Sequence, residues 1–425
     1  MYARHSGGTF VLRIEDTDAE RSQDDLVAAI RHHLAWLGID WDEEYRQSDR
    51  FDMYRAAAQD FLDRSLAYRC DCSQEAVKER AAARGESSGY DGFCRDRDVQ
   101  PGDGVVVRFR TPDDGVTAWD DLIRGRVEFD NAVLEDFVIV RSNGVPMFHV
   151  ANAYDDLDMN ITHVVRGEDL VNTVPRVLLL REAMGATEHP AYAHLPLIVN
   201  EKRQKLSKRR DDVSVGDYAD RGFLPEAMRN YLLTLGWGPK DDIEIRPIQE
   251  FVEVFELSDI NAAPAFFDIK KLEHFNAEYI RALSLDDFLE RSAPFRGDIE
   301  LSLFTVLAPE IQSRLRRLDE IPKFVDWVVG DAPEPSEKDW RKVMQKDGVA
   351  QVLDLVIARF EEADWTPSIL EEIVTGVGTE LDTKTQLPVR LAVTGSRSGL
   401  PLFEPLAAVD RDIVMQRLRE ARDRL

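Results

Sequence analysis

Cysteines and long apolar runs are both scarce in this sequence. The 425-residue chain has only three cysteines, whereas a secreted chain of this size usually carries a larger, even number. No apolar run approaches the roughly 20 residues that a membrane-spanning helix needs. The N-terminal sequence MYARHSGGTF also lacks the apolar core of a secretory signal. These absences predict a soluble protein of the cytoplasm that does not enter a membrane.

Basic residues are fewer than acidic ones. The chain has 54 lysines and arginines against 80 aspartates and glutamates, which gives a formal net charge of −26. This acidic excess argues against general, nonspecific binding of nucleic acids. It is equally consistent with a surface adapted for solubility or for a salty habitat. Against this background, residues 202–210 (KRQKLSKRR) hold six basic side chains in nine positions. Such a local basic segment is still able to bind an anionic group.

The N-terminal part of the chain predicts an α/β layer. Phe10, Leu12 and Ile14 alternate with the period of a strand. Ser22 then offers an N-cap for a helix that ends at Gly38. A second helix is expected after the sequence QSDR and runs to about residue 65. A strand followed by two helices of these lengths is typical of an α/β domain.

The pattern changes after residue 70 and changes again after residue 216. Charged loops first surround short strands, and residues 136–150 (DFVIVRSNGVPMFHV) predict a hairpin with Asn143 and Gly144 in a type I′ turn. The α/β pattern resumes with ITHVVRG, a helix through VPRVLLLREAMG and the strand HLPLIV. Beyond residue 216 the patterns are almost all helical. We therefore expect an α/β domain that is interrupted by an insertion and followed by helical domains.

The basic segment contains Lys205 and Lys208, with the hydroxyl group of Ser207 between them. It follows the end of a predicted strand, which is where ligands of open parallel sheets bind. Two ammonium groups at this spacing are able to surround a polyphosphate. The alternative interpretation is an ordinary solvated basic loop.

Several stretches together carry a resemblance that favours the first interpretation. The sequence HLPLIVNEKRQKLSKRRDDVSV resembles the Lys-Met-Ser-Lys-Ser loop of class I aminoacyl-tRNA synthetases, in the form typical of glutamyl-tRNA synthetases. FVLRIEDTDAERS and FHVANAYDDLDMNITHVVRGEDLVNTVPRVLLL resemble the two halves of that family's glutamate site. GFLPEAMRNYLLTLGW and FDIKKLEHFNAEYI are similar to its stem-contact domain, and LPVRLAVTGSRSGLPLFEPLAAVDRDIVMQRL to its anticodon-binding end.

The resemblance implies a Rossmann-like class I synthetase catalytic domain with an α+β insertion, followed by all-α stem-contact and anticodon-binding domains. The expected boundaries are residues 1–69 and 146–216 for the catalytic domain, 70–145 for the inserted acceptor-binding domain, 217–298 for the stem-contact domain and 299–425 for the anticodon-binding domain. It further implies that the basic segment binds the triphosphate of ATP, which Mg²⁺ accompanies. Lys208 is the expected phosphate ligand, with Lys205 and Ser207 in support.

The amino-acid pocket follows from charge as well as from the resemblance. A glutamate ligand carries one ammonium and two carboxylate groups, so Glu15 would bind the ammonium and Arg166 a carboxylate. The alternative is that Glu15 and Arg166 form only a surface pair. The resemblance points to the same two residues and adds Phe148 and Asn152. Phe148 is a departure, because the family commonly has tyrosine there and one hydroxyl group is therefore lost.

All three cysteines, Cys70, Cys72 and Cys94, fall within one short segment. Many members of the family hold a structural zinc ion here with Cys-x-Cys and Cys-x-His or Cys-x-Tyr pairs. In this sequence the fourth ligand would be Asp96, which is chemically able to bind zinc but less usual in a structural site. The alternative is a site that has lost its zinc and kept three thiols.

The sequence also lacks a feature that the resemblance leads us to expect. It has eight histidines but no His-x-Gly-His, whereas class I synthetases carry a His-Ile-Gly-His signature that helps to hold ATP. The missing segment comprises roughly 25 residues and would supply a central strand of an open sheet. We expect that Met1 is an internal methionine, and that the chain as written charges tRNA negligibly whereas a form extended by roughly 25–30 residues charges it normally.

The leading functional hypothesis is a glutamate–tRNA ligase that acts on tRNA(Glu). A catalytically inactive tRNA-binding protein is the alternative, and adenylate formation would discriminate the two. A glutamyl-queuosine synthetase would lack the C-terminal helical domains, and a glutaminyl enzyme would be expected to end in β-barrels. The expected partners are tRNA(Glu), glutamate and ATP, and the expected state is a monomer. The sequence leaves open whether tRNA(Gln) is a second substrate.

Overall fold

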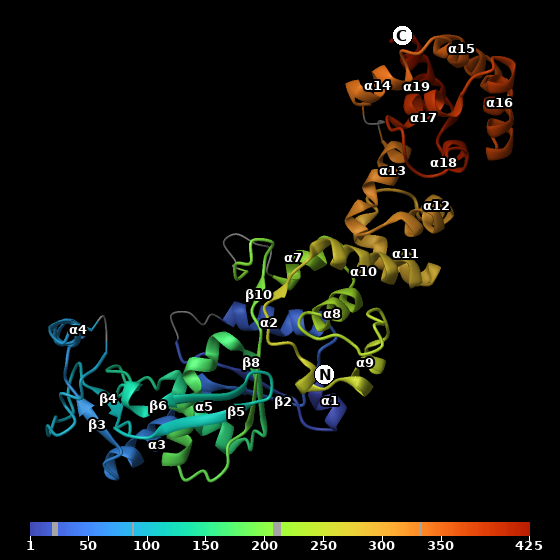
Figure 1. Cartoon of the computed structure of the whole chain (residues 1–425). Coiled ribbons are helices and arrows are strands. Elements are labelled where there is room, and N and C mark those ends of the chain that lie inside the picture. The colour runs from blue at the N-terminus through green and yellow to red at the C-terminus, as the bar shows by residue number, and fades with distance from the viewer. Residues whose placement is uncertain (19–23, 87–88, 207–213, 331–333) are drawn as a thin grey trace. The chain divides into compact units, whose positions relative to one another are not determined.

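The computed structural model describes residues 1–18, 24–86, 89–206, 214–330 and 334–425 (Figure 1). The chain divides into two compact units. Unit 1 comprises Met1–Val213 and Arg229–Asp268, and unit 2 comprises Ser214–Met228 and Ile269–Leu425. The expected order of an α/β part followed by a helical part is confirmed.

Unit 1 begins with a parallel strand pair. After the short helix α1 (Tyr2–Ser6), strand β1 (Val11–Ile14) pairs with β2 (Glu43–Arg46), and α2 (Asp24–Trp36) connects them. The strand and the helix were both predicted from their apolar periods. The proposed N-cap Ser22 lies outside the described residues. Helix α3 (Phe51–Asp63), also predicted, then buries Tyr54, Ala58 and Phe61 at helical spacing.

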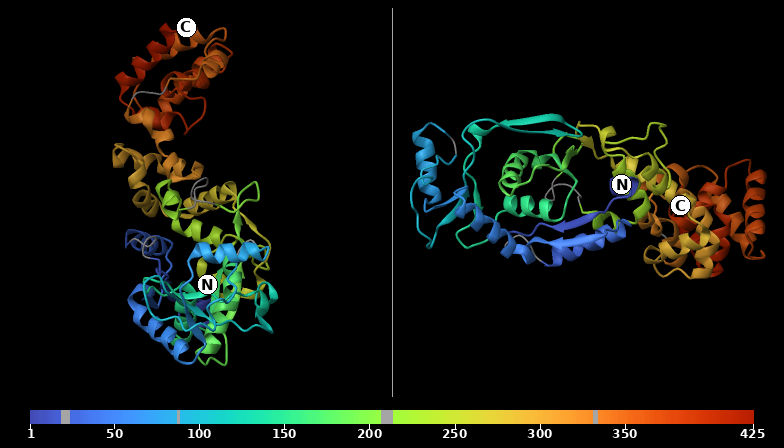
Figure 2. Two further views of the ribbon diagram at one scale, coloured as in Figure 1. Left: turned by 90° about the vertical axis from the view of Figure 1, so that its left-hand side faces the viewer. Right: turned by 90° about the horizontal axis from the view of Figure 1, so that it is seen from below.

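The largest sheet of unit 1 has four strands in the order β6-β5-β9-β8. Strands β5 (Val116–Asp121) and β6 (Gly125–Asp130) form an antiparallel ribbon, seen in turquoise in Figure 2. Strand β9 (Ala191–Leu195) lies parallel to β8 (His163–Gly167) and also pairs with β5 at Asp121. Part of the segment expected as an insertion therefore joins the same sheet as the α/β segment that follows it. Helix α6 (Val174–Ala183) connects β8 to β9 and is buried along most of its length.

A second sheet of unit 1 has three antiparallel strands in the order β3-β4-β7, with bounds Ala67–Cys70, Val106–Phe109 and Val138–Val140. Its apolar side packs with α3, α5 (Phe148–Asp158) and α6 in one buried cluster that includes Phe61, Phe109 and Ile139. Helix α4 (Gln74–Ala83) follows β3, and its N-cap Ser73 accepts a hydrogen bond from the N–H group of Ala76 at 3.1 Å.

The predicted hairpin over residues 136–150 forms only as a short antiparallel pairing, and its predicted turn type is wrong. Its second arm is limited to a single bridge between Val140 and Pro146, and the chain enters α5 at Phe148. The turn is not type I′ either, because Gly144 has a φ of 78° whereas Asn143 does not have the positive φ that a type I′ turn requires. The N–H group of Gly144 donates to the carbonyl oxygen of Arg141 instead.

The rest of unit 1 adds a short strand pair and an apolar cluster. The predicted strand HLPLIV is split at Pro196 into β9 and β10 (Ile198–Val199), and β10 pairs in parallel with β11 (Ala265–Phe266). Helix α9 (Ile248–Val254) contributes Phe251 to a buried cluster with Trp237 and Phe255. The division between the two units falls within α8 (Pro225–Leu233).

Unit 2 is helical throughout its described residues, as predicted. It contains α7 (Val215–Asp220), α10 (Ile269–Ala282), α11 (Leu285–Ser292), α12 (Leu301–Arg314), α13 (Pro322–Val329), α14 (Glu337–Val343), α15 (Val349–Phe360), α16 (Pro367–Glu380), α17 (Gln386–Thr394), α18 (Phe403–Ala408) and α19 (Arg411–Asp423). One large cluster of buried aliphatic and aromatic side chains connects most of them. No helix among the described residues of either unit is long and apolar enough to span a bilayer.

Candidate active site

Strand β1 ends in a charged group of side chains. Arg13 and Glu15 lie two residues apart and so point to the same side of the extended chain. Arg13 Nε donates to Glu15 Oε1 at 3.3 Å, and Arg13 Nη1 donates to Asp156 Oδ1 at 2.7 Å. Asp156 belongs to α5, and its side chain is only 3% exposed. Arg13 therefore connects the end of β1 to α5.

Glu15 and Arg166, which the sequence predicts in one pocket, act on each other electrostatically. The Glu15 side chain is 32% exposed, which leaves it accessible to a ligand. Burial raises the pKa of the Glu15 carboxyl group, while the charges of Arg13 and Arg166 lower it. Glu15 directly follows β1 and Arg166 lies on β8, two strands far apart in sequence, and the fold places their opposite charges close enough to interact.

Arg166 is fixed by bonds on one edge of its guanidinium group. Its Nε donates to His194 Nε2 at 3.3 Å, and its Nη2 donates to Thr173 Oγ1 at 3.1 Å and to the Leu170 carbonyl oxygen at 3.4 Å. Burial lowers the pKa of Arg166, and the neighbouring Tyr192, Glu15 and Asp156 act in the opposite direction. An arginine in such a setting favours an anionic ligand.

Asn152 and Phe148 lie one turn apart on α5, the helix that also carries Asp156. Asn152 is 1% exposed, and its Oδ1 accepts a hydrogen bond from Gln47 Nε2 at 2.8 Å. Asn152 Nδ2 has no partner among the described residues, so it is a buried donor that a ligand could satisfy. Phe148 is half-buried at the start of the helix and packs edge-on against His149.

Tyr192 is a member of this site that was not predicted from the sequence. It lies on β9, is 1% exposed, and its hydroxyl group has no partner within the described part of the chain. Burial raises its pKa, and the charges that act on the hydroxyl group include those of Asp156 and Arg166. The alternation of Tyr192 and His194 in the strand AYAHL placed both on one side of β9, and this was the available signal.

The described part of the basic segment lies beside the end of β8. Lys205 forms a bridge with Val199, and its Nζ lies 2.8 Å from Oδ2 of Asp169, three residues after Arg166. The bond to Lys205 lowers the pKa of Asp169. The ion pair is about half exposed, with 57% of Lys205 and 51% of Asp169 accessible, so Lys205 can exchange its partner for a phosphate. Ser207 and Lys208 lie outside the described residues.

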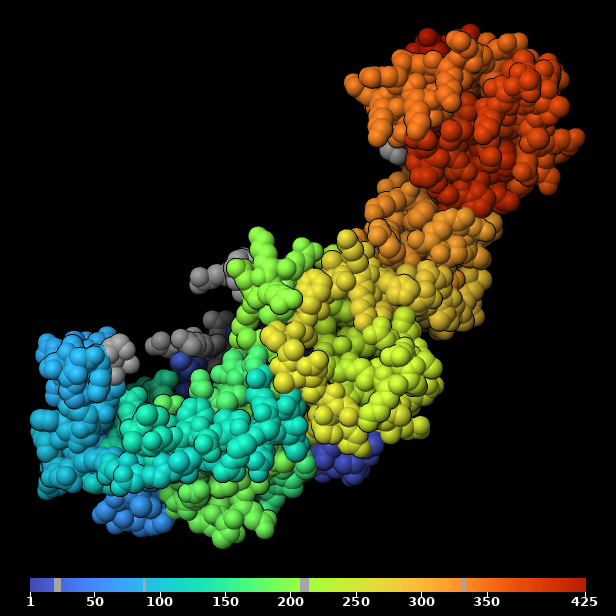
Figure 3. Space-filling view, in the orientation of Figure 1, coloured from blue at the N-terminus to red at the C-terminus, as the bar shows by residue number. Residues whose placement is uncertain are grey.

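The three cysteines gather in a separate lobe of unit 1, which is light blue in Figure 3. Cys70, Cys72 and Cys94 have their Sγ atoms within 4.8 Å of one another, and Cys72 Sγ lies 3.4 Å from Cys94 Sγ. Burial raises the pKa of Cys94 to about 11. Burial also opposes ionisation of Cys70, but bonds from the Tyr90 hydroxyl group and the Cys72 N–H group lower its pKa.

Asp96 is not brought to these thiols. Its side chain is 93% exposed, and its nearest charged partner is Arg110 Nη2 at 3.4 Å. The oxygen atoms near the thiols are the Tyr90 hydroxyl group, 3.5 Å from Cys70 Sγ, and Asp71 Oδ1, 3.3 Å from Cys94 Sγ.

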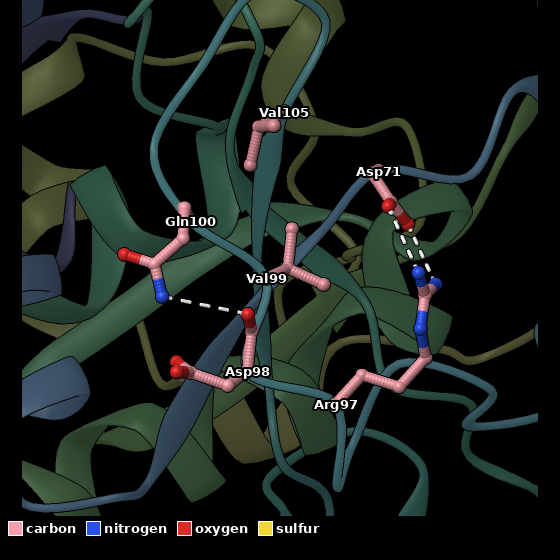
Figure 4. Close-up of a pocket in the computed structure, with 6 residues that line it drawn as sticks. All are labelled: Asp71, Arg97, Asp98, Val99, Gln100 and Val105. Carbon is pink, nitrogen blue, oxygen red and sulfur yellow. Dashed lines mark hydrogen bonds and ion pairs between the residues drawn. The ribbon is translucent and has the colours of Figure 1, made fainter.

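A shallow recess adjoins the cysteines. Figure 4 shows Arg97 turned toward Asp71, to which it donates hydrogen bonds at 2.8 and 3.1 Å. The recess is lined by Asp71, Arg97, Asp98, Val99, Gln100 and Val105. The recess is shallow and its lining carries both charges, so it does not resemble the amino-acid site around Glu15 and Arg166.

The arrangement around Glu15 suits a zwitterion that carries additional negative charge. Glu15 offers an accessible carboxylate for an ammonium group, and Arg166 offers a fixed guanidinium for a carboxylate. Asn152 Nδ2 and the Tyr192 hydroxyl group add buried neutral donors. Lys205 lies next to this group through Asp169.

Family models match almost the entire chain. Residues 1–274 match the catalytic domain of class I tRNA synthetases (E and Q), and residues 261–422 match an anticodon-binding domain. The glutamate–tRNA ligase of Thermobifida fusca is 47% identical over 98% of this chain and 91% of its own length. That of Frankia casuarinae is 46% identical over 100% of this chain and 93% of its own.

A solved structure supports the same assignment. The crystal structure of a glutamate tRNA ligase from Elizabethkingia meningosepticum in complex with its amino acid has a TM-score of 0.85 to this chain and is 27% identical. The match covers 99% of this chain and 94% of the other. Both the predicted fold class and the predicted family are therefore confirmed. The chain belongs to the glutamate–tRNA ligase family of class I tRNA synthetases.

Proposed function

We propose that this protein joins glutamate to tRNA(Glu) at the expense of ATP. The observation that carries the proposal is the placement of an accessible carboxylate, Glu15, within electrostatic range of a guanidinium group, Arg166, that is held by His194 and Thr173. A ligand with an ammonium group and a carboxylate group satisfies both. Glutamate has the required groups, and the family resemblance of the sequence around Glu15 and Arg166 supports this choice of site.

The reaction has two steps. An oxygen of the glutamate α-carboxylate attacks the α-phosphorus of ATP, pyrophosphate leaves, and glutamyl-adenylate forms. The terminal ribose hydroxyl group of tRNA then attacks the acyl carbon, and AMP leaves. Cations stabilise the negative charge that develops on the departing pyrophosphate. Lys208 is the proposed main phosphate ligand, with Lys205 and Ser207 in support, and Mg²⁺ accompanies ATP.

Phe148 and Asn152 complete the proposed glutamate pocket. Phe148 offers an apolar surface without the hydroxyl group that the family commonly has there. The buried hydroxyl group of Tyr192 is a candidate replacement for that donor, because it lies in the field of Asp156 and Arg166. Asn152 Nδ2 supplies a second buried donor.

We also propose that Cys70, Cys72 and Cys94 hold one structural Zn²⁺. Thiols within 4.8 Å of one another fit tetrahedral coordination, in which Zn–S bonds of about 2.3 Å place the sulfur atoms a little under 4 Å apart. The position of the Tyr90 hydroxyl group makes it a better candidate than Asp96 for the fourth ligand. When bound, the ion would cross-link β3 to the loop that carries Cys94.

We propose a monomer that acts in the cytoplasm, with tRNA(Glu) as the main nucleic-acid substrate and tRNA(Gln) as a second substrate to be tested. The local basic segment and the helical unit 2 support a tRNA partner despite the acidic composition.

Transfer of radiolabelled glutamate to purified tRNA(Glu) tests the proposed function. The protein expressed from its complete reading frame should charge tRNA(Glu) with glutamate and should not charge it with aspartate or glutamine. Parallel reactions with tRNA(Gln) determine whether it is a second acceptor. Absence of glutamate charging under conditions in which the T. fusca relative is active would contradict the proposal.

A further inference from the structure

Behind Arg166 lies a buried pair of side chains that the proposed reaction does not use directly. His194 on β9 and Asp121 at the end of β5 are both completely buried, and His194 Nδ1 lies 2.5 Å from Asp121 Oδ2. The other carboxylate oxygen of Asp121 accepts hydrogen bonds from the backbone N–H groups of Ile123, Arg124 and His194. The carboxylate is therefore well satisfied although it is buried.

These bonds fix the protonation of both groups. Burial opposes the charge on Asp121, but the bonds from His194 and the backbone lower its pKa, so the carboxylate is ionised. Burial lowers the pKa of His194 in spite of Asp121, so the imidazole is neutral. A neutral imidazole has one N–H group, and its place is at Nδ1 beside the carboxylate. Nε2 is left as an acceptor that faces Arg166.

Arg166 uses this acceptor. Its Nε donates to His194 Nε2, and its Nη2 donates to Thr173 Oγ1. Among the described residues, none forms a hydrogen bond with Arg166 Nη1. The protein thus occupies the Nε–Nη2 edge and leaves Nη1 for a ligand. The Arg166 side chain has several rotatable bonds, and without these hydrogen bonds its guanidinium group would have no fixed orientation.

We propose that Asp121 and His194 are positioning residues that aim Arg166 at a carboxylate group of glutamate. This inference rests on the proposed role of Arg166 in glutamate binding. Buried ionic groups generally add little stability compared with apolar side chains of the same shape. A buried Asp–His–Arg chain is therefore better explained by the orientation it gives Arg166 than by a contribution to folding.

The test compares His194→Phe with His194→Gln. Phenylalanine keeps the ring but removes both hydrogen bonds, whereas glutamine retains a donor for Asp121 and an acceptor for Arg166. For His194→Phe we expect KM for glutamate to rise about tenfold, as for the loss of a bond to a charged group. The KM for ATP and kcat should change less than threefold, as for a loss of ground-state binding. His194→Gln should recover most of the affinity for glutamate.

Asp121→Asn tests which nitrogen of the His194 imidazole must carry the proton. The asparagine amide is able to donate to Nδ1, which would place the imidazole proton at Nε2 and turn it toward Arg166. We expect KM for glutamate to rise at least as much as in His194→Phe.

Leu178→Ala is the matched control, because Leu178 is buried on α6 in the same cluster as Tyr192 but makes no polar contact. It should lower the melting temperature and leave KM for glutamate unchanged. A similar rise of KM in Leu178→Ala, or an unchanged KM in His194→Phe, would overturn the proposal. If Arg166→Ala itself leaves KM for glutamate unchanged, the proposed glutamate site is wrong instead.

Discussion

Gln47 donates a side-chain N–H group to Asn152 Oδ1 at 2.8 Å, and both side chains are almost fully buried. The same nitrogen of Gln47 also donates to Asp155 Oδ2 at 3.3 Å, so the amide N–H groups of Gln47 face two acceptors. The pair fixes the amide of Asn152 with its Nδ2 directed away from Gln47. Asn152 is thereby held as a hydrogen-bond donor to the proposed pocket.

We predict that Gln47→Leu weakens glutamate binding. Leucine has a similar size but no donor, so the Asn152 amide loses the bond that fixes its orientation. KM for glutamate should rise about fivefold, in keeping with the value of one hydrogen bond. Gln59→Leu on the exposed side of α3 is the control and should leave KM unchanged. Equal KM values for the two variants would show that Gln47 does not orient Asn152.

Glutamate affinity should depend on pH through Glu15. Burial raises the pKa of the Glu15 carboxyl group in the free protein, so this group takes up a proton as the pH falls toward the acid range. Only the ionised form attracts an ammonium group. We therefore expect the Kd for glutamate to increase as the pH is lowered into the acid range, beginning at a higher pH than an ordinary glutamate side chain would produce.

Glu15→Gln provides the comparison for this pH dependence. It should bind glutamate at least about 30-fold more weakly at pH 8, as expected when one partner of a charge pair is removed. Its Kd should change little between pH 8 and about 5.5, where Glu15 is absent as a titrating group. Equilibrium dialysis with radiolabelled glutamate measures both proteins. A pH dependence that persists in Glu15→Gln must come from another group.

Zinc measurements on variants distinguish Tyr90 from Asp96 as the fourth ligand of the proposed zinc site. Elemental analysis of the purified protein should find about one zinc ion per chain, as in a closed structural site. Cys72→Ser should lower the zinc content, and Tyr90→Phe should make the ion easier to remove with a chelator. Asp96→Ala should behave as the unchanged protein, because the Asp96 side chain is exposed and directed to Arg110. Protein that is free of zinc and fully active would favour a site that has lost its metal.

Lys208→Ala should slow adenylate formation by about 100-fold or more, as expected for the loss of a cation that stabilises developing charge. ATP–pyrophosphate exchange in the presence of tRNA(Glu) measures this step. Lys202→Ala is the control, because Lys202 belongs to the same basic segment and is exposed in the turn before Lys205. If Lys202→Ala slows the exchange as much as Lys208→Ala, the rate depends on the net charge of the segment and not specifically on Lys208.

The sequence predicted Glu15 and Arg166 because the chemistry of a ligand requires opposite charges, and a family resemblance placed them at strand ends. It did not predict Asp121, His194 or Tyr192. Their contacts depend on the pairing of β5 with β9, which joins residues about 70 positions apart and leaves no local pattern. The periodicity of apolar residues likewise does not indicate which polar side chains are buried.

Local patterns were reliable where one face of an element is buried and unreliable where most faces are. Helix α3 buries Tyr54, Ala58 and Phe61 at regular spacing and was predicted. Helix α5 buries consecutive residues from Val150 to Ala153, so the helical period is hidden, and its start was read as the arm of a hairpin. Asp96 was chosen as a metal ligand because it occupies the last position of the family's Cys-x-His or Cys-x-Tyr pair, whereas the fold directs its side chain to solvent.

We propose that Arg166 binds a carboxylate group of glutamate in a glutamate–tRNA ligase. The most direct test is the glutamate dependence of tRNA(Glu) charging by the protein from its complete reading frame, compared with Arg166→Ala and the control Arg126→Ala, an exposed arginine on β6. We predict charging by all three proteins, with KM for glutamate increased about 30-fold or more only in Arg166→Ala. An unchanged KM in Arg166→Ala would contradict the proposed role of Arg166, and no glutamate charging by the unmodified protein would contradict the proposed ligase activity.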